Sequence, residues 1–250
     1  MSGEHAENRT VFALTGEDRV EFLQNIVTND VVGLQHGLVY AALLSPQGKY
    51  LADFFLVPDG ERILIDVDSD LAASLFKRLS MYKLRAAVTL EQVAIPVARG
   101  LGEAPEGGYA DPRDTSLGWR AYGLEAGPPS IDWDAIRVAQ CIPQSQIELI
   151  PDQTFILEAG FEQFAGVDFR KGCYVGQEVT ARMKHKTTLR KGYRQVRLDG
   201  EVPVGSEILS AGKPAGTVFT QANGAGIAYL RFDRISDDMT ANDVKVVVAD

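Results

Sequence analysis

The most informative stretch of the sequence is Lys171-Gly172-Cys173-Tyr174-Val175-Gly176-Gln177-Glu178, followed by Arg182. Val175, Val179 and Met183 recur at helical spacing, which predicts a helix with Cys173 at its N-terminus. A thiol in that place beside Arg170 is favoured as the thiolate, because the helix dipole and the cation both stabilise negative charge. The stretch therefore indicates a reactive cysteine.

A structural interpretation of the same cysteine stays open. A buried cysteine at a tight turn into a helix packs like a small apolar side chain and needs no reactivity. The neighbours favour neither interpretation decisively: Gly172 and Gly176 leave room for a ligand or partner to approach the backbone, and Lys171 adds a second cation. The other cysteine, Cys141, lies in an apolar phrase without such neighbours and is expected to be packing.

The charge is distributed unevenly along the chain. The net charge of −9 argues against a general polyanion binder. Residues 170–197, however, hold nine basic side chains and one acidic, a charge of +8 that leaves −17 on the rest. This basic strip is either a solvated surface or a place to which an anionic ligand tail, an acidic partner or RNA is steered.

Length and composition limit the class of protein. The 250 residues suffice for one large domain or two modest ones with their own core. No apolar run approaches the roughly 20 residues that span a bilayer, and the first residues do not resemble a secretory signal, so we expect a cytoplasmic protein without a membrane partner. The two cysteines lie 32 positions apart and match no metal-ligand spacing, so no metal site is predicted.

Hydrophobic patterning predicts an α+β fold. Strands are expected over 11–14, 38–44, 50–57, 62–67 and 86–93, with helices around 20–27 and 71–79. The second and third of these strands are separated by a five-residue hairpin turn, Ser45-Pro46-Gln47-Gly48-Lys49. Helices interleaved with antiparallel hairpins favour α+β over a doubly wound parallel sheet.

The second half of the chain divides into a long loop, the motif and a β-rich tail. Residues 100–130 hold seven glycines and four prolines and are expected to form a long loop. Five strand-like runs follow residue 188, which predicts a small β-barrel or sandwich. We therefore expect an α+β region over 1–188 with two subdomains and a barrel subdomain over 189–250.

Two further residues are candidates for a binding site. Asp53 is an acid within an otherwise apolar strand, where it either hydrogen-bonds a heterocycle or caps the strand end. Trp133 offers a large flat surface near a predicted helix start, although most such tryptophans are core residues.

The motif resembles that of the folate-binding YgfZ family, relatives of the aminomethyltransferase of the glycine cleavage system (GcvT). Three further stretches agree with this resemblance: Phe22-Leu23-Gln24-Asn25-Ile26-Val27-Thr28-Asn29-Asp30, Leu44-Ser45-Pro46-Gln47-Gly48-Lys49, and Asp111-Pro112-Arg113 with Leu117-Gly118-Trp119-Arg120. Together they span most of the chain.

The resemblance implies a ring of three subdomains around a central folate pocket, with a C-terminal β-barrel. It implies an accessory factor, rather than a turnover enzyme, that depends on tetrahydrofolate, including polyglutamylated forms, and that serves the assembly or repair of iron-sulfur proteins. Its partners would be iron-sulfur clients or assembly proteins, among them enzymes that modify tRNA. Cys173 and Lys171 correspond to the family's reactive residues, Trp133 and Asp53 to folate contacts, and the rest of the motif is Gly172, Tyr174, Gly176, Gln177, Glu178 and Arg182.

Two other functions stay open. One is a one-carbon (aminomethyl) transferase acting with tetrahydrofolate, and the other is a non-catalytic module that binds RNA or protein through the basic strip. The chain also departs from the family pattern at positions expected near the pocket: Arg9, Cys141, Leu157, Gly160 and Thr187.

Overall fold

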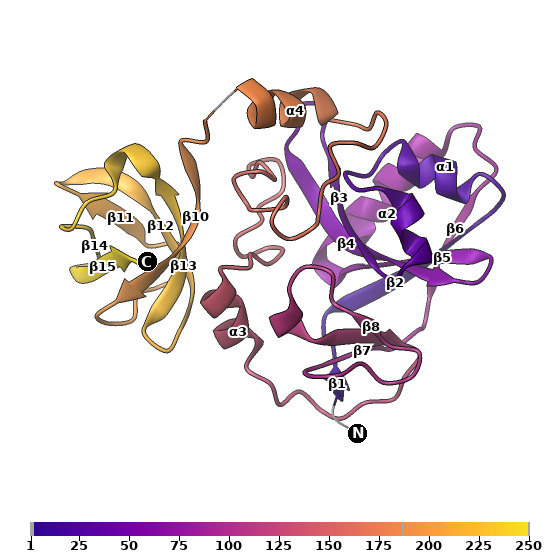
Figure 1. The fold of residues 1–250 in the computed structure, drawn as a ribbon, viewed down its shortest axis with the longest axis horizontal. Coiled ribbons are helices and arrows are strands. Elements are labelled where there is room, and N and C mark those ends of the chain that lie inside the picture. The colour runs from indigo at the N-terminus through magenta and orange to yellow at the C-terminus, as the bar shows by residue number, and fades with distance from the viewer. Residues whose placement is uncertain (1–2, 187, 250) are drawn as a thin grey trace.

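A computed structural model describes residues 3–186 and 188–249. Its strands form two open sheets and one closed barrel. Figure 1 shows the five-stranded sheet on one side, the barrel on the other, and the second open sheet below them. No helix in the described ranges is both long and apolar enough to cross a membrane.

The five-stranded sheet has the order β3-β4-β5-β2-β6, and all its pairs are antiparallel. Its strands are β2 (Arg9–Thr15), β3 (Val39–Leu44), β4 (Tyr50–Asp59), β5 (Arg62–Asp68) and β6 (Thr89–Val93). The apolar runs of β3 and β4 are buried on both faces because helices and the chain over 149–174 pack around them. The helices here are α1 (Arg19–Gln24), α2 (Ser69–Lys83) and the 3-10 helix η1 (Val31–Gln35).

The second open sheet is small and joins the N-terminus to the middle of the chain. It consists of β1 (Gly3–His5), β7 (Val97–Gly100), β8 (Tyr109–Ala110) and β9 (Trp119–Tyr122), in the order β1-β7-β9-β8, with the 3-10 helix η2 (Thr115–Leu117) beside it. Residues 100–130 are therefore not one long loop as predicted, because two short strands within them pair with their neighbours. Most of their glycines and prolines lie in the segments before β8 and after β9.

The tail closes into a barrel in the order β10-β13-β12-β11-β14-β15. The strands are β10 (Lys191–Leu198), β11 (Glu207–Ser210), β12 (Lys213–Ala222), β13 (Ala225–Arg231), β14 (Thr240–Ala241) and β15 (Val244–Val248), with the 3-10 helix η3 (Phe232–Arg234). The predicted five strands are present, and the two-residue β14 completes the closure. The barrel interior is apolar and includes Val196, Val218 and Val246.

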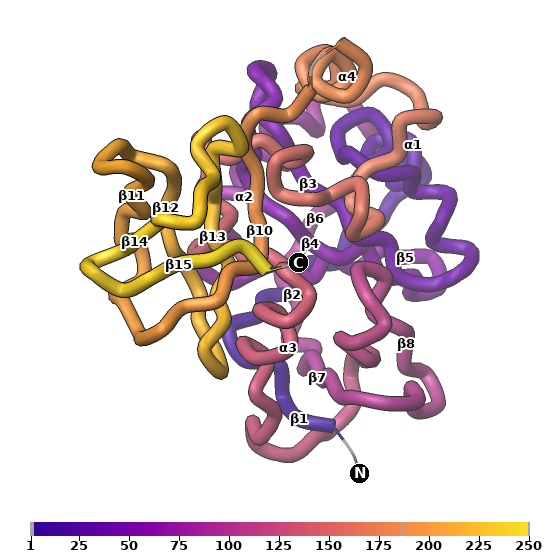
Figure 2. The backbone as a smooth tube through the Cα atoms, turned by 60° about the vertical axis from the view of Figure 1, so that its left-hand side comes forward, coloured from indigo at the N-terminus to yellow at the C-terminus, as the bar shows by residue number. Residues whose placement is uncertain are grey.

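Two helices connect these units. Helix α3 (Trp133–Gln140) packs against η2 on one side and against barrel strands β12 and β13 on the other. Helix α4 (Gln177–Lys186) precedes the barrel. The turned view in Figure 2 shows α3 between the barrel and the small sheet, so the three units surround the middle of the molecule.

Candidate functional site

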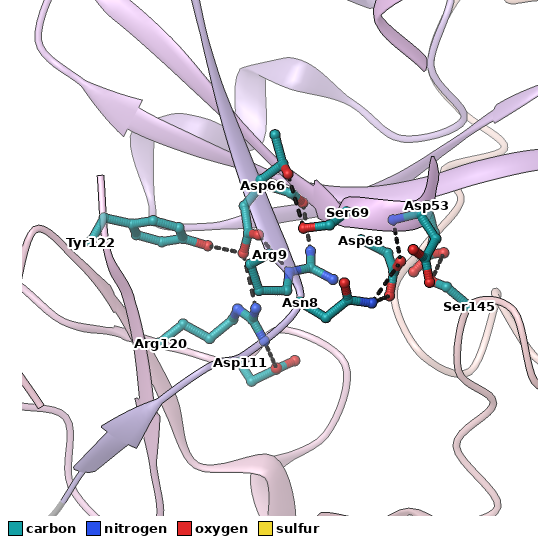
Figure 3. Close-up of polar contacts among 12 residues, drawn as sticks. Asn8, Arg9, Asp53, Asp66, Asp68, Ser69, Asp111, Arg120, Tyr122 and Ser145 are labelled. Atoms are coloured by element: carbon teal, nitrogen blue, oxygen red, sulfur yellow. Dashed lines mark hydrogen bonds and ion pairs between the residues drawn. The ribbon is translucent and has the colours of Figure 1, made fainter. Parts of the chain in front are cut away.

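A cavity of about 380 Å³ lies where the two open sheets meet α3. Its walls come from β2, β4, β7, β9 and α3, and they include Arg9, Asp53, Arg99, Arg120 and Trp133. The two residues that sequence predicted as folate contacts, Asp53 and Trp133, therefore line one cavity although they lie 80 positions apart. The close-up in Figure 3 shows part of the polar network in and behind its walls, including Arg9, Asp53 and Arg120.

Trp133 is held in place by Glu4, a residue that no sequence pattern singled out. The buried carboxylate of Glu4 accepts hydrogen bonds from Trp133 Nε1 at 2.5 Å, from Ile131 N at 2.8 Å and from Ser130 N at 2.5 Å. Burial alone would raise the pKa of Glu4, but these hydrogen bonds hold it below its usual value. The N-terminal strand thus fixes the aromatic wall of the cavity.

Asp53 accepts hydrogen bonds from three hydroxyl groups. Tyr40 Oη donates to it at 3.0 Å, Tyr50 Oη at 2.5 Å and Ser145 Oγ at 2.6 Å. Burial, together with the Asp53 charge, raises the pKa of both tyrosines well above the usual value, so both remain protonated donors. Asp53 therefore sits as an oriented acceptor within β4 at the cavity wall.

Arginines form the opposite wall and share two buried carboxylates. Asp66 accepts from Arg9 Nε at 2.6 Å and from Arg120 Nη2 at 2.9 Å (Figure 3). Arg113 binds Asp111 through two nitrogens, and Arg120 lies 4.0 Å from the same carboxylate. Burial would raise the pKa of Asp66, but the two guanidinium groups lower it. Because Asp66 belongs to β5 and Arg120 to β9, this ion pair joins the two open sheets.

A second buried network joins the cavity to the barrel. Arg137 of α3 lines the cavity and donates to Glu148 at 3.2 Å and to Thr220 Oγ1 of β12 at 3.0 Å. Glu148, which is fully buried, also accepts from Thr220 Oγ1 at 2.5 Å. The barrel is therefore attached through the same helix that carries Trp133.

The motif occupies a separate surface and does not begin a helix at Cys173 as predicted. Helix α4 starts at Gln177, because Gly176 has a φ of +81° that a helix does not accommodate. A Cβ at Gly176 would lie 2.6 Å from the carbonyl oxygen of Ser45, so this turn before the helix accommodates only glycine. Cys173 is exposed in the preceding loop and is not among the described residues that line the cavity.

Lys171 is buried beside this loop. Its ammonium donates to the carbonyl oxygens of Gln24 at 2.8 Å, Val27 at 2.5 Å and Asn29 at 3.0 Å, where α1 ends. Burial lowers the pKa of Lys171 to about 8, against the opposing effect of nearby acids. This geometry anchors the loop, and the reactive role assigned to Lys171 stays a prediction.

Of the remaining motif residues, some are buried and others are exposed to solvent. Tyr174 is buried, and burial raises its pKa to about 12. Glu178 and Arg182 form an exposed pair at 2.8 Å along α4, and Gln177 Nε2 donates to the carbonyl oxygen of Gly172. The structure thus places Cys173 and Gly172 at the exposed end of a loop that is held on both sides.

The residues that depart from the family pattern lie in different parts of the molecule. Arg9 lines the central cavity, whereas Cys141, Leu157 and Gly160 line a second cavity of about 770 Å³ next to β10. Thr187 lies outside the described residues.

Comparisons with known proteins agree with this architecture. Residues 190–250 match the family described as the CAF17 C-terminal beta-barrel domain. The crystal structure of the glycine cleavage system aminomethyltransferase T from Bartonella henselae superposes with a TM-score of 0.78 over 99% of this chain and 84% of that one, at 13% sequence identity. The molecule is therefore an α+β protein of the aminomethyltransferase T fold with a C-terminal barrel, which confirms the predicted fold class.

Sequence relatives define the family. The iron-sulfur cluster assembly factor IBA57 of Mus musculus is 30% identical over 276 residues, which cover 92% of this chain and 77% of the mouse protein. The IBA57 homolog of Pyricularia oryzae is 32% identical over 211 residues, which cover 74% of this chain and 54% of that protein. The chain thus spans about half the length of this fungal relative and about three quarters of the mouse one. It belongs to the IBA57/CAF17 family, which is YgfZ-like as the motif predicted.

Proposed function

We propose that this protein is a tetrahydrofolate-dependent accessory factor for the assembly or repair of iron-sulfur proteins. The relatives are named iron-sulfur cluster assembly factors, which supports the iron-sulfur part of this function. The folate part rests on one observation, the convergence of Asp53 and Trp133 on a single cavity. The partners would be iron-sulfur client or assembly proteins, and the cytoplasmic location stays a prediction.

The size of the central cavity and the side chains that line it are suited to a folate. A cavity of about 380 Å³ lies within the range of about 300–1,000 Å³ that is typical of small-molecule sites. Arg99, Arg120 and Arg137 line it, and within the described residues the Nε of each is buried without an acceptor. A ligand with many acceptor groups, such as the pterin ring and glutamate tail of a folate, would use this donor capacity.

Tetrahydrofolate would be held between Asp53, Trp133 and the arginine wall, and when bound it would supply one-carbon carrier chemistry. The hydroxyl groups around Asp53 keep this carboxylate oriented towards the cavity wall, and Glu4 keeps Trp133 in place. The surrounding strands exclude bulk water from the buried ion pairs.

Cys173 would act at a different surface. Its exposure leaves the thiol open to a cluster that is being transferred or to a partner's thiolate, and the basic strip around it favours an acidic partner face. The cluster is cargo in this proposal, and Cys173 provides one contact to it. Folate binding and cluster handling would then occur on separate surfaces of one molecule.

Complementation tests this function. In a strain without the protein, the activities of iron-sulfur enzymes should fall, and the wild type and Cys141→Ala should restore them. Cys173→Ala and Trp133→Ala should not, at equal protein levels. Calorimetric titration with tetrahydrofolate should give heat with the wild type and a much weaker response with Trp133→Ala. Full restoration by both variants would refute the proposal, and no heat with the wild type would remove its folate part.

A further inference from the structure

Arg99 is an unusual guanidinium group in the cavity wall. Within the described residues, the side chains of Arg9, Arg113, Arg120 and Arg137 each donate at least one short hydrogen bond. Arg99 has a long ion pair with Glu4, at 3.5 Å, and its Nε is buried without a hydrogen-bond acceptor. A guanidinium has five N–H donors, and groups that are largely removed from water usually find acceptors. The Arg99 side chain is 28% exposed, so it can be reached from the cavity that it lines.

The nearby carboxylates are already occupied by other donors. Glu4 lies directly opposite Arg99 in the pairing of β1 with β7, but its oxygens accept from the Trp133, Ile131 and Ser130 nitrogens. The ion pair between Arg99 Nε and Glu4 Oε1 is correspondingly long, at 3.5 Å. Asp66 is likewise taken, because Arg9, Arg120 and the hydroxyl of Tyr122 all donate to it.

Arg99 places a second positive charge directly beside that of Arg120. Arg99 and Arg120 are direct partners across β7 and β9, and like charges in such a pair destabilise a sheet. Burial, followed by the charge of Arg120, lowers the pKa of Arg99 to about 10, so Arg99 remains charged at neutral pH. An anion beside both side chains would offset this repulsion.

Apart from Glu7, an exposed residue that also lines the cavity, the acidic side chains in the rest of the wall are engaged with other donors. Asp111 pairs with Arg113, Asp134 pairs with Arg137, and Asp132 caps α3 by accepting from Ala135 N. Asp53 and Asp68 accept from hydroxyl, amide and backbone donors on the side of the cavity formed by β4 and β5. These acids are thus occupied, whereas Arg99 has a long ion pair with Glu4 and keeps further donors available.

Trp133 gives Arg99 a defined orientation. The guanidinium carbon lies 4.3 Å from the centre of the indole ring, and the ring itself is fixed by Glu4. A stacked guanidinium presents its N–H groups sideways, in the planar fork that matches a carboxylate.

We propose that Arg99, stacked on Trp133 and paired across the sheet with Arg120, binds a carboxylate group of the ligand that occupies the central cavity. This inference rests on the proposed function insofar as the ligand is a folate, whose glutamate tail carries carboxylates. The subsite itself follows from the unoccupied donors. Arg99 therefore determines that the cavity selects acidic ligands over neutral ones of the same shape.

Paired ligands and variants test this subsite. The folate probes are 5-formyltetrahydrofolate and the same molecule with both glutamate carboxylates methylated, each titrated calorimetrically into the full chain. Arg99→Gln should weaken binding of the free acid by about tenfold to a hundredfold, since hydrogen bonds to charged groups are worth about 1.5–3 kcal/mol. It should leave binding of the diester nearly unchanged. Arg99→Lys should fall between wild type and Arg99→Gln, and Arg62→Gln, which removes an exposed surface arginine, should bind both ligands as the wild type does.

Glutarate, a small dicarboxylate, tests the carboxylate subsite independently of the proposal that the ligand is a folate. Ligand-observed NMR should detect saturable glutarate binding by the wild type and by Arg62→Gln but not by Arg99→Gln. Glutarate binding without folate binding would refute the folate function and leave the subsite supported. Any of three results would overturn the subsite. Arg99→Gln could weaken binding of the free acid and of the diester equally, or it could bind glutarate as the wild type does. The third such result is that the wild type binds neither acid.

Discussion

The two cysteines differ in their surroundings more than in their sequence spacing. Cys173 is exposed at the end of the motif loop, whereas Cys141 is half-buried at the C-terminal cap of α3. Burial raises the pKa of Cys141 to about 12, so very little thiolate forms there at neutral pH. Because Cys173 lies in the loop before α4, the helix dipole does not contribute to the expected activation of its thiol. The exposure of the thiol is the part of the expectation that the structure supports.

We predict that iodoacetamide labels Cys173 at least tenfold faster than Cys141 in the native protein at pH 7.5. The thiolate is the reacting species, and access favours Cys173 as well. Peptide mass spectrometry against time measures both rates in one sample, and the single variants Cys141→Ala and Cys173→Ala confirm the assignment. Equal rates would contradict the proposed use of Cys173.

At the scale of elements, the loop over 168–176 depends on contacts with α1 and with the β3–β4 turn. Lys171 binds three carbonyl oxygens at and just after the end of α1, and Gly176 packs against the carbonyl of Ser45. These contacts fix the chain on both sides of Cys173, while Gly172 and Cys173 remain exposed. A preformed loop reduces the conformational entropy that a partner must remove on binding.

We predict that Lys171→Met loosens this loop. The substitution leaves three carbonyl groups without their donor, and hydrogen bonds that involve a charged group are each worth about 1.5–3 kcal/mol. Hydrogen exchange should speed up over residues 24–29 and 168–176 while the barrel strands keep their protection. Lys77→Met, at an exposed position of α2, is the matched control and should exchange like the wild type. Unchanged exchange in Lys171→Met would show that the ammonium does not anchor the loop.

Periodicity predicted the long elements but not the small sheet that completes the cavity. Asp53 and Trp133 were recognisable because each stands out within a long strand or at a helix start. Glu4, Arg99 and Arg120 gave no comparable signal, since strands of three or four residues are too short to show alternation. Their roles come from the pairing of β7 with β9 and with β1, and the second of these pairs joins segments 93 to 97 residues apart. The helix start was wrong because the positive φ of Gly176 depends on a close approach to Ser45 that is remote in sequence.

For the molecule as a whole, charge serves two purposes. The basic strip over 170–197 remains the predicted docking region for an acidic partner, although Lys171 within it is buried and Lys184 is paired with Glu162 at 2.5 Å. The buried ion pairs, by contrast, hold the subdomains together. Asp66 connects β5 with β9, and Glu148 connects α3 with the barrel.

Because these contacts involve ionised carboxylates, we predict that the junction between the two open sheets weakens in acid. The pKa values of Asp66, Asp111 and Glu4 are lowered in the folded protein. Their stabilising contribution is therefore complete above the ordinary carboxyl pKa of about 4 and is lost as the pH falls through the lower folded values. Asp68 acts in the opposite direction, since burial raises its pKa. Urea denaturation of the wild type should give a free energy of unfolding that is nearly constant from pH 7 to pH 5 and decreases below about pH 4.

Asp66→Asn isolates the junction from the other carboxylates. It leaves Arg9 and Arg120 buried without their shared counter-ion, so it should cost about 3–5 kcal/mol at pH 7, as expected when one partner of a buried ion pair is removed. The stability of this variant should then depend less on pH below pH 4, because one of the protonations that weaken the wild type is absent. Asp59→Asn removes an acid from a partly exposed pair with Arg62 and should change the stability by less than about 1 kcal/mol at either pH. If Asp66→Asn loses stability in acid as steeply as the wild type, protonation of Asp66 is not what separates the two sheets.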